Sequence, residues 1–381
     1  MGERFIGLMS GTSLDGVDGV IYDFSNASPQ STVKTTAQVT TFSSAPFPAA
    51  LRAELLALNK AGANELHRAA LAANALTRVY AQVVSQLLAQ ANLLPSDICA
   101  IGAHGQTVRH RPGEFDGIGY TLQLNNPALL AELTGIDVVA DFRSRDVAAG
   151  GQGAPLVPAF HQEVFGRPNS AVTVLNIGGI SNLSVLGKDE PVLGFDCGPG
   201  NALMDYWCHL HTGQFFDADG AWAASGQVNQ ALLNQFMTEP FIGKKPPKST
   251  GRDLFNLAWL QQYMHKFQDV APVDVQATLT EFTALACAKN TNDFTSLDGQ
   301  QSKTLIVCGG GALNGHLMRR LQAALPNSVV ASSETLGLPP LQVEAAAFAW
   351  LARKAVRHET ASFKSVTGAQ GSRILGAIYP A

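Results

Sequence analysis

A strand, a glycine-containing turn and a returning strand occur twice in this chain, and this repeat constrains the fold most. The first copy covers residues 4–24 and the second residues 171–186, and a further strand and then helices follow each copy. Short apolar runs interrupted by glycine are typical of paired strands. The copies share no obvious residue identity, so the repeat is one of topology. It predicts an α/β protein with two similar domains, 1–168 and 169–381, and a ligand cleft between their glycine turns.

The length of 381 residues supports this division, because it exceeds what one ordinary hydrophobic core accommodates. The C-terminal helix and tail are assigned to the second domain, and packing against the first domain is left open. A hydrophobic fraction of 46% with 15% charged residues indicates a well-packed protein rather than a disordered chain. The net charge is −4 and no basic stripe is present, so nucleic acid is not expected as a partner.

Hydropathy and cysteine content indicate the compartment. No apolar run reaches the length of about 18 residues that a membrane span needs, and a strand begins at residue 4. We therefore expect a cytoplasmic protein without a signal peptide or a membrane span. The five cysteines form no CxxC pair, which predicts reduced thiols in the core.

Three glycine-rich loops follow apolar, strand-like runs and could offer main-chain N–H groups to the phosphates of a nucleotide. They read MSGTSLDG, NIGGISNL and CGGGALNG, and the third leads directly into a helix, whose N-terminus favours anions. Each alone also suits an ordinary turn, but all three together favour a nucleotide site. No GxxxxGK[ST] occurs, which excludes a P-loop ATPase. Gly309, Gly311 and Asn314 approach GxGxxG, but the final asparagine and the late position disfavour a dinucleotide-binding oxidoreductase.

Asp196 is the candidate general base. It ends a strand in GFDCGPGN, immediately before a rigid turn, so its carboxylate is expected to face the cleft rather than the core. A carboxyl group with a usual pKa of about 4 is ionised at neutral pH and can accept a proton. The alternative, that Asp196 caps the following helix, is disfavoured because Asn201 directly precedes that helix and suits the cap.

Polar side chains are dense in AHGQTVRH, directly after another apolar strand. The segment contains His104, Gln106, Thr107, Arg109 and His110. Such a group suits recognition of a substrate that carries hydroxyl or amide groups, and a solvated loop is the alternative.

Two other charged features allow a functional and a structural interpretation. Arg143 and Arg145 have forked guanidinium groups that suit a carboxylate, and surface ion pairs with Asp141 or Asp146 suit them equally well. Glu344 lies in the first turn of an apolar helix, where it either stabilises the helix dipole or contacts the substrate.

Seven segments, in order, resemble those of the anhydro-N-acetylmuramic acid kinases. They are MSGTSLDGVDG, AHGQTVRHRPG, DFRSRDVAAGGQGAPLVP, NIGGISN, GFDCGPGN, PPKSTGRD and CGGGALN, and the similarity continues through the C-terminal GAIYPA. These kinases belong to the superfamily of acetate and sugar kinases, Hsp70 and actin. The resemblance thus implies two ribonuclease-H-like domains of duplicated topology with an interdomain ATP cleft.

The resemblance also implies a reaction. ATP and water would convert 1,6-anhydro-N-acetylmuramic acid to N-acetylmuramic acid 6-phosphate and ADP, in the recycling of bacterial cell-wall peptidoglycan. Asp196 would deprotonate the water that opens the anhydro ring. Mg²⁺ is expected with ATP. Its protein ligands are not assigned, and Asp15 is the one candidate. The family setting is cytoplasmic, and a homodimer is expected.

Site residues follow from the same resemblance. Those implied for the ATP phosphates are Gly11, Thr12, Ser13, Leu14, Asp15, Gly16, Val17 and Asp18, together with Gly178 and Gly179. Those implied for the adenosine are Gly309, Gly310, Gly311 and Asn314. The candidates for sugar contacts are His104, Gln106, Thr107 and Glu344.

Two other functions compete with this one. A related kinase could phosphorylate an ordinary sugar hydroxyl, in which case Asp196 would deprotonate that hydroxyl and no bridge would open. An ATP-driven conformational or chaperone-like module is the other alternative. It is disfavoured because the two halves use up the chain and leave no separate peptide-binding domain.

Overall fold

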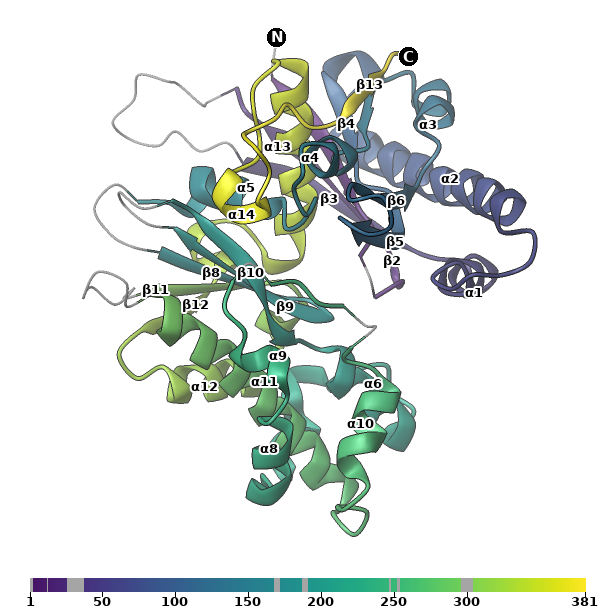
Figure 1. The fold of residues 1–381 in the computed structure, drawn as a ribbon. Coiled ribbons are helices and arrows are strands. Elements are labelled where there is room, and N and C mark those ends of the chain that lie inside the picture. Colours follow the sequence, from purple (N-terminus) through teal and green to yellow (C-terminus); the bar gives the residue numbers. More distant parts are fainter. Residues whose placement is uncertain are drawn as a thin grey trace. The chain divides into compact units, whose positions relative to one another are not determined.

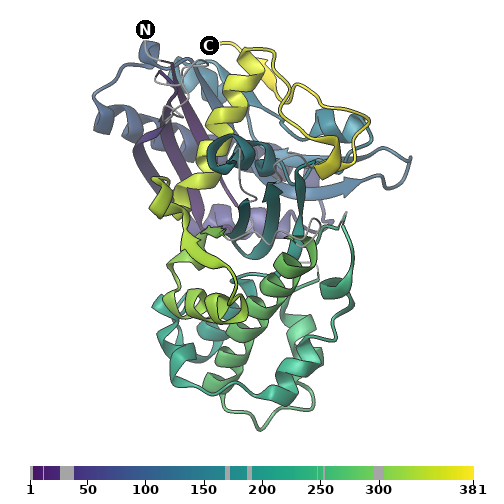
Figure 2. The ribbon, with the colours of Figure 1, turned by 90° about the vertical axis from the view of Figure 1, so that its left-hand side faces the viewer.

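The computed structural model describes residues 3–11, 13–25, 38–167, 172–186, 191–246, 248–251, 254–295 and 304–381 (Figures 1 and 2). The chain divides into two compact units, the first formed by Met1–Phe160 with Leu341–Ala381 and the second by His161–Pro340. The second unit thus begins before the expected division after residue 168. The C-terminal helix and tail belong to the first unit.

A six-stranded sheet forms the centre of the first unit, in the order β13-β7-β4-β1-β2-β3. Its strands are β1 (Arg4–Met9), β2 (Gly16–Asp23), β3 (Gln38–Pro46), β4 (Ala100–Ala103), β7 (Val138–Ala140) and β13 (Ala377–Tyr379). The predicted strand–turn–strand over residues 4–24 is confirmed, because β1 pairs antiparallel with β2. On its other side β1 pairs parallel with β4.

The second unit contains a five-stranded sheet in the order β10-β9-β8-β11-β12. Its strands are β8 (Val172–Ile177), β9 (Ile180–Leu186), β10 (Leu193–Pro199), β11 (Thr304–Cys308) and β12 (Val329–Ser332). As in the first unit, an antiparallel hairpin is extended by a third antiparallel strand on one side and by parallel strands on the other. The predicted duplication of topology is therefore confirmed.

The C-terminal helix α13 (Val343–Val356) packs on the first sheet at two paired glycines. Gly7 of β1 and Gly102 of β4 are register partners. A Cβ on Gly7 would overlap the main chain of Ala345, and a Cβ on Gly102 would overlap that of Phe348. Only glycine allows a helix backbone to come this close to a sheet. This close approach places the end of the chain in the first unit.

Helix α2 (Glu65–Ala91) covers the opposite face of the same sheet. Gly19 of β2 pairs with Leu8, whose side chain points away from the face that Gly7 presents to α13. A Cβ on Gly19 would contact Val83 of α2. The first unit therefore has a helix–sheet–helix layering.

Shorter elements complete the first unit. They are the hairpin β5 (Gln106–Pro112) and β6 (Gly119–Leu124), with η1 (Pro95–Asp97), α1 (Ala49–Ala57), α3 (Pro127–Thr134), α4 (Ser144–Ala148) and α14 (Lys364–Thr367). Helix α5 (Val157–Phe165) contains the division between the units.

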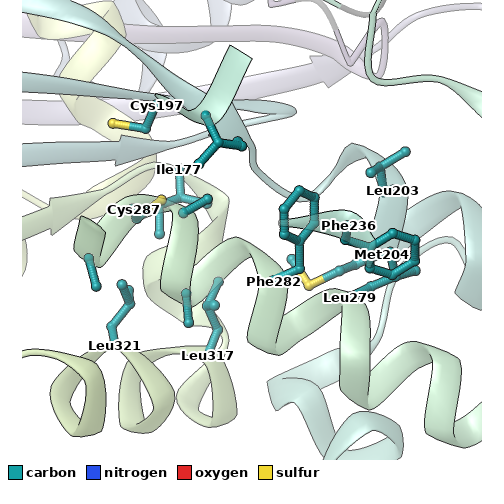
Figure 3. Close-up of a cluster of buried hydrophobic side chains, with 14 of the residues drawn as sticks. Ile177, Cys197, Leu203, Met204, Phe236, Leu279, Phe282, Cys287, Leu317 and Leu321 are labelled. Carbon is teal, nitrogen blue, oxygen red and sulfur yellow. The ribbon is translucent and has the colours of Figure 1, made fainter. Parts of the chain in front are cut away.

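Helix α11 (Pro272–Thr295) lies at the centre of the second unit's core (Figure 3). Its Leu279, Phe282 and Cys287 pack in one buried cluster with side chains from β8, β10 and α12 (Gly315–Ala324). Phe195 and Cys197, on either side of Asp196, are fully buried in the same cluster. The cluster therefore packs α11 against β10, the strand that carries Asp196.

The remaining helices of the second unit are α6 (Ala202–Thr212), α7 (Ala221–Ser225), α8 (Gln230–Phe236), α9 (Pro240–Gly243) and α10 (Leu257–Met264). Short turns of 3₁₀ helix also occur, at η2 (Ala218–Gly220), η3 (Gly310–Leu313), η4 (Ser333–Leu336) and η5 (Pro340–Gln342). Of the described helices, none combines the length and the apolar character needed to cross a bilayer. The cysteines are free thiols, and all except the exposed Cys99 are buried.

Candidate active site

The first glycine turn joins β1 to β2 and is tightly folded. Leu14 adopts a left-handed conformation with φ of +56°, and its N–H donates to the carbonyl of Gly11 at 3.3 Å. The carboxylate of Asp15 accepts from the hydroxyl of Ser13 at 2.7 Å and from the N–H of Gly16 at 3.0 Å. Of the residues implied for phosphate binding, Leu14 and Val17 have buried side chains. Thr12 lies outside the described residues.

A buried hydrogen-bond network holds the beginning of this turn. The Ser10 hydroxyl donates to the carbonyl of Gly105 at 3.1 Å, so it accepts from the Tyr80 hydroxyl at 2.9 Å. Tyr80 in turn accepts from the N–H of Gly105 at 3.1 Å, and burial raises the pKa of its phenol. The Gln106 amide donates to the carbonyl of Gly11 at 3.1 Å. Residues of α2 and of the β4–β5 connection therefore fix the turn. Tyr80 was missed from sequence because it looks like one more member of the apolar face of α2.

Three of the predicted sugar-contact residues form hydrogen bonds within the protein itself. His104 is buried and engages the Ser10 carbonyl and the Arg143 guanidinium through its two ring nitrogens. Gln106 is also buried and holds the turn as described. Thr107 is half-buried and accepts from the side-chain amide of Gln123 at 3.2 Å.

The remaining charged residues of this segment have structural partners. Arg109 forms an ion pair with Glu65 at 2.7 Å and donates to the carbonyl of Leu58. His110 contacts the hydroxyl of Thr121 at 3.0 Å. Arg109 and His110 therefore bond within the protein from strand β5, and the alternative of a solvated loop is wrong for them.

Asp18, at the start of β2, interacts electrostatically with two other carboxylates. Burial raises the pKa of Asp18 to about 7, and the negative charges of Asp15 and Glu344 add to this effect. Glu344 lies in the first turn of α13, so the packing of α13 on β1 brings its charge to the first glycine turn. In the first unit the structure thus collects the turn, His104, Gln106 and Glu344 in one region.

The second glycine turn joins β8 to β9 and is tied to the segment that follows β10. The carbonyl of Gly178 accepts from the N–H of Asn201 at 2.8 Å, and that of Gly179 accepts from the N–H of Gly200 at 3.0 Å. A Cβ on Gly200 would overlap the main chain of Gly178. The predicted side-chain cap of α6 by Asn201 is wrong, because this amide donates instead to the carbonyl of Ile177 at 3.2 Å.

The third glycine loop lies against the same residue, Ile177. Gly309 has φ of +77°, and a Cβ there would overlap the carbonyl of Ile177, while a Cβ on Gly311 would overlap its side chain. Asn314 caps α12 by accepting from the N–H of Leu317 at 2.9 Å. In the second unit the structure thus brings the predicted phosphate turn and the predicted adenosine loop, which includes Gly310, into contact with one strand end.

Asp196 lies on β10, the edge strand of this sheet, and is half-buried. A β-bulge follows it, because Asp196 pairs with Asn182 whereas Gly198 pairs with Ser181. Bulges redirect side chains and are frequent next to active sites. The N–H of Thr250 donates to Oδ2 of Asp196 at 2.8 Å, which orients a carboxylate otherwise suited to accept a proton.

Two α/β units that share the order of five strands, each with glycine turns at the ends of its central strands, define a two-domain protein of the ribonuclease-H-like fold. The family model "Anhydro-N-acetylmuramic acid kinase" matches residues 3–381. The chain belongs to this family. It is 65% identical to the anhydro-N-acetylmuramic acid kinase of Variovorax paradoxus (strain S110) over 385 residues, with 100% of both chains covered. It is 63% identical to that of Albidiferax ferrireducens over 401 residues, again with 100% of both covered.

Among solved structures, component A of the Acidaminococcus fermentans (R)-2-hydroxyglutaryl-CoA dehydratase is similar with a TM-score of 0.49 and 12% identity. The similarity covers 91% of this chain and 96% of that one.

Proposed function

We propose that this protein uses ATP and water to convert 1,6-anhydro-N-acetylmuramic acid to N-acetylmuramic acid 6-phosphate and ADP in peptidoglycan recycling. The observation that carries the proposal is the match to the kinase family over residues 3–381, together with full-length relatives of that name. The presentation of Asp196 at a sheet edge supports it, because the reaction needs a carboxylate that can take a proton from water.

In this reaction Asp196 accepts a proton from the attacking water as the water oxygen bonds to C1 of the sugar. The bond between C1 and O6 breaks, and O6 takes the γ-phosphoryl group while ADP leaves. The Thr250 N–H donates to Oδ2 of Asp196 and so fixes the direction of the carboxylate that takes the proton. Oriented groups of this kind reduce the entropic part of the barrier.

ATP would be bound by the three glycine loops. We assign the phosphates to the turn from Gly11 to Asp18 and to Gly178 and Gly179, where main-chain groups of small residues line each turn. We assign the adenosine to the loop from Gly309 to Gly311 and Asn314. The close packing of this loop on Ile177 supports the assignment, because a side chain at Gly309 or Gly311 would push the loop off the strand.

Mg²⁺ is part of this proposal. It prefers one or two carboxylates together with phosphate oxygens and water, rather than a site made of protein ligands alone. The donors present fit this preference: the start of β2 offers Asp15 and Asp18, and no larger metal-binding cluster of His, Cys, Asp and Glu occurs among the described residues. Asp15 and Asp18 would hold the ion, which when bound neutralises charge on the transferring phosphoryl group.

For the sugar, Thr107 and Glu344 are the proposed direct contacts, because both side chains are only half-buried. His104 and Gln106 would act by holding the first turn, since their polar groups already bond to Ser10 and Gly11. We also propose that the enzyme works in the cytoplasm and that it is a homodimer. Sedimentation of the purified protein tests the oligomeric state.

The function is tested by running the reaction in ¹⁸O-labelled water. Opening of the anhydro bridge places the label at C1 of the phosphorylated product, provided the product is analysed before the hemiacetal exchanges. A kinase for an ordinary sugar hydroxyl would give unlabelled product. ATP turnover that no amino sugar alters would instead favour an ATP-driven conformational module.

The role of Asp196 is tested by Asp196→Asn. We expect turnover to be lost while ATP still binds, because the amide keeps the shape but takes up no proton. Retained turnover would falsify the base assignment.

A further inference from the structure

Lys248 is a buried lysine in the loop that bonds to Asp196. Its side chain is among the few buried charged groups, with 8% of its surface exposed. The ammonium group donates to Oδ1 of Asn290 at 2.8 Å and lies 3.3 Å and 3.4 Å from the carbonyls of Phe241 and Ile242. It also lies over two aromatic rings, 4.9 Å from that of Phe241 and 5.7 Å from that of Phe195. These neutral groups help to compensate the burial of the cation.

The same lysine bonds to the main chain of Asp196. The N–H of Asp196 donates to the carbonyl of Lys248 at 3.2 Å, and two residues later the N–H of Thr250 donates to the Asp196 carboxylate at 2.8 Å. Residues 248–250 therefore lie along the edge strand β10 and form hydrogen bonds with both the main chain and the carboxylate of Asp196.

Asn290 of α11 connects Lys248 to Cys197, the residue that follows Asp196. While its Oδ1 accepts from Lys248, its Nδ2 donates to the carbonyl of Cys197 at 3.3 Å and to that of Ala286 at 2.8 Å. Cys197 is the extra residue of the β-bulge. One connected path thus runs from the residue after Asp196, through Asn290 and the ammonium group, to the segment that holds the Asp196 carboxylate.

We propose that Lys248, together with Asn290, is a positioning residue that sets the direction of the Asp196 carboxylate by locking the loop 248–250 and the bulge to α11 and α9. The inference rests on the proposed role of Asp196 as the base. A lysine suits this position because one ammonium group has three donors that reach three separate acceptors. An apolar side chain of the same length would remove a donor from each of those buried acceptors.

The test compares Lys248→Met and Lys248→Arg with Lys245→Met, which removes a lysine charge at an exposed position of the same loop. We expect Lys248→Met to lower kcat by on the order of 10²-fold, because a displacement of about 1 Å at a catalytic group has that effect. The KM values and the nucleotide Kd should stay near those of the wild type. Lys248→Arg should recover part of the loss, and Lys245→Met should match the wild type.

Two results would overturn the proposal: a wild-type kcat in Lys248→Met, or a loss in which nucleotide binding weakens as much as kcat falls. If Lys248→Met does not fold, Asn290→Ala takes its place, since the ammonium group then keeps its two carbonyl contacts. In the double variant Lys248→Arg/Asn290→Ala the losses should not multiply, because both residues act through one path. Multiplying losses would count against a single path.

The control for the underlying role is Asp196→Asn. If this variant keeps its turnover, the assignment of the base fails. If it loses turnover while Lys248→Met keeps wild-type kcat, the base assignment stands and the positioning role alone fails.

Discussion

Arg143 donates a hydrogen bond to Nε2 of His104 across 2.9 Å. Because a guanidinium group has no acceptor, Nε2 must carry the lone pair, and the proton is then on Nδ1, which faces the Ser10 carbonyl at 3.3 Å. Burial and the positive charge of Arg143 hold the pKa of His104 well below its usual value. His104 thus connects Arg143 to the first glycine turn as a neutral imidazole.

The first prediction concerns the stability of the protein at low pH. Burial also lowers the pKa of His161, to about 3, in the second unit. A histidine whose pKa is depressed by folding contributes stability above its usual pKa of about 6.5, and this stability is lost as the pH falls. At pH 5 we expect His161 to reduce the free energy of unfolding by about 2 kcal/mol relative to neutral pH.

The measurement is urea unfolding at several pH values between neutral and pH 5. His161→Gln should show a smaller loss on acidification than the wild type, whereas the exposed His67→Gln should show the same loss. An unchanged pH dependence in His161→Gln would contradict the prediction.

The second prediction concerns Asp18, whose pKa is raised to about 7 by burial and by Asp15 and Glu344. A carboxyl group with a raised pKa contributes stability at low pH, and this contribution disappears as the pH rises through about 7. Asp18→Asn remains neutral, so its stability relative to the wild type should increase between pH 5 and pH 8. Thermal unfolding across this range checks it, with the exposed Asp269→Asn as the control. A constant difference from the wild type would refute the raised pKa.

The third prediction concerns Gly7, which lies against the main chain of Ala345 in α13. Gly7→Ala forces α13 away from β1, and overpacking at a backbone contact typically costs about 1–3 kcal/mol or more. We expect a loss at the upper end of that range, together with weaker activity because Glu344 moves with α13. Denaturant unfolding measures the loss. Gly243→Ala is the matched control, since nothing lies within 4 Å of a Cβ at Gly243.

The fourth prediction concerns Tyr80. Tyr80→Phe leaves the N–H of Gly105 without the acceptor at 3.1 Å and removes the donor to Ser10, which should cost about 1–3 kcal/mol. Because Ser10 begins the first glycine turn, ATP should also bind more weakly. Calorimetric titration with ATP checks this, and Tyr120→Phe on the exposed hairpin should bind ATP normally. If Tyr80→Phe binds ATP with unaltered affinity, the hydrogen-bond network around Ser10 does not support nucleotide binding, and the prediction is wrong.

Much of the fold could be predicted from the sequence because its signals are local. The apolar run before Gly11 and the glycines at 178 and 179 are enough to predict two hairpins, and the structure contains both. The expected repeat of topology in the two halves followed from the same pattern. The membership of the C-terminal helix in the first unit could not be predicted, because it depends on the pairing of Gly7 with Gly102, which are far apart in the sequence.

The candidate site divides in the same way. Its glycine loops and Asp196 are marked by residue type at the ends of strands. The partners that hold them carry no such mark: Lys248 reads as part of a polar, proline-bearing loop, and Asn290 as one more residue of a helix. Arg109 shows the reverse case, since a polar side chain in a promising segment forms an ion pair with Glu65.

The sequence by itself determined the order of strands and turns, the two-fold repeat and the family, because these depend on neighbouring residues and on motifs in a fixed order. Only the tertiary structure decided which side chains are buried, which carboxylates share one region and what holds Asp196. Burial and electrostatic interaction depend on distance in space, and folding brings Asp18 near Glu344 and Lys248 near Asn290 although long stretches of chain separate them.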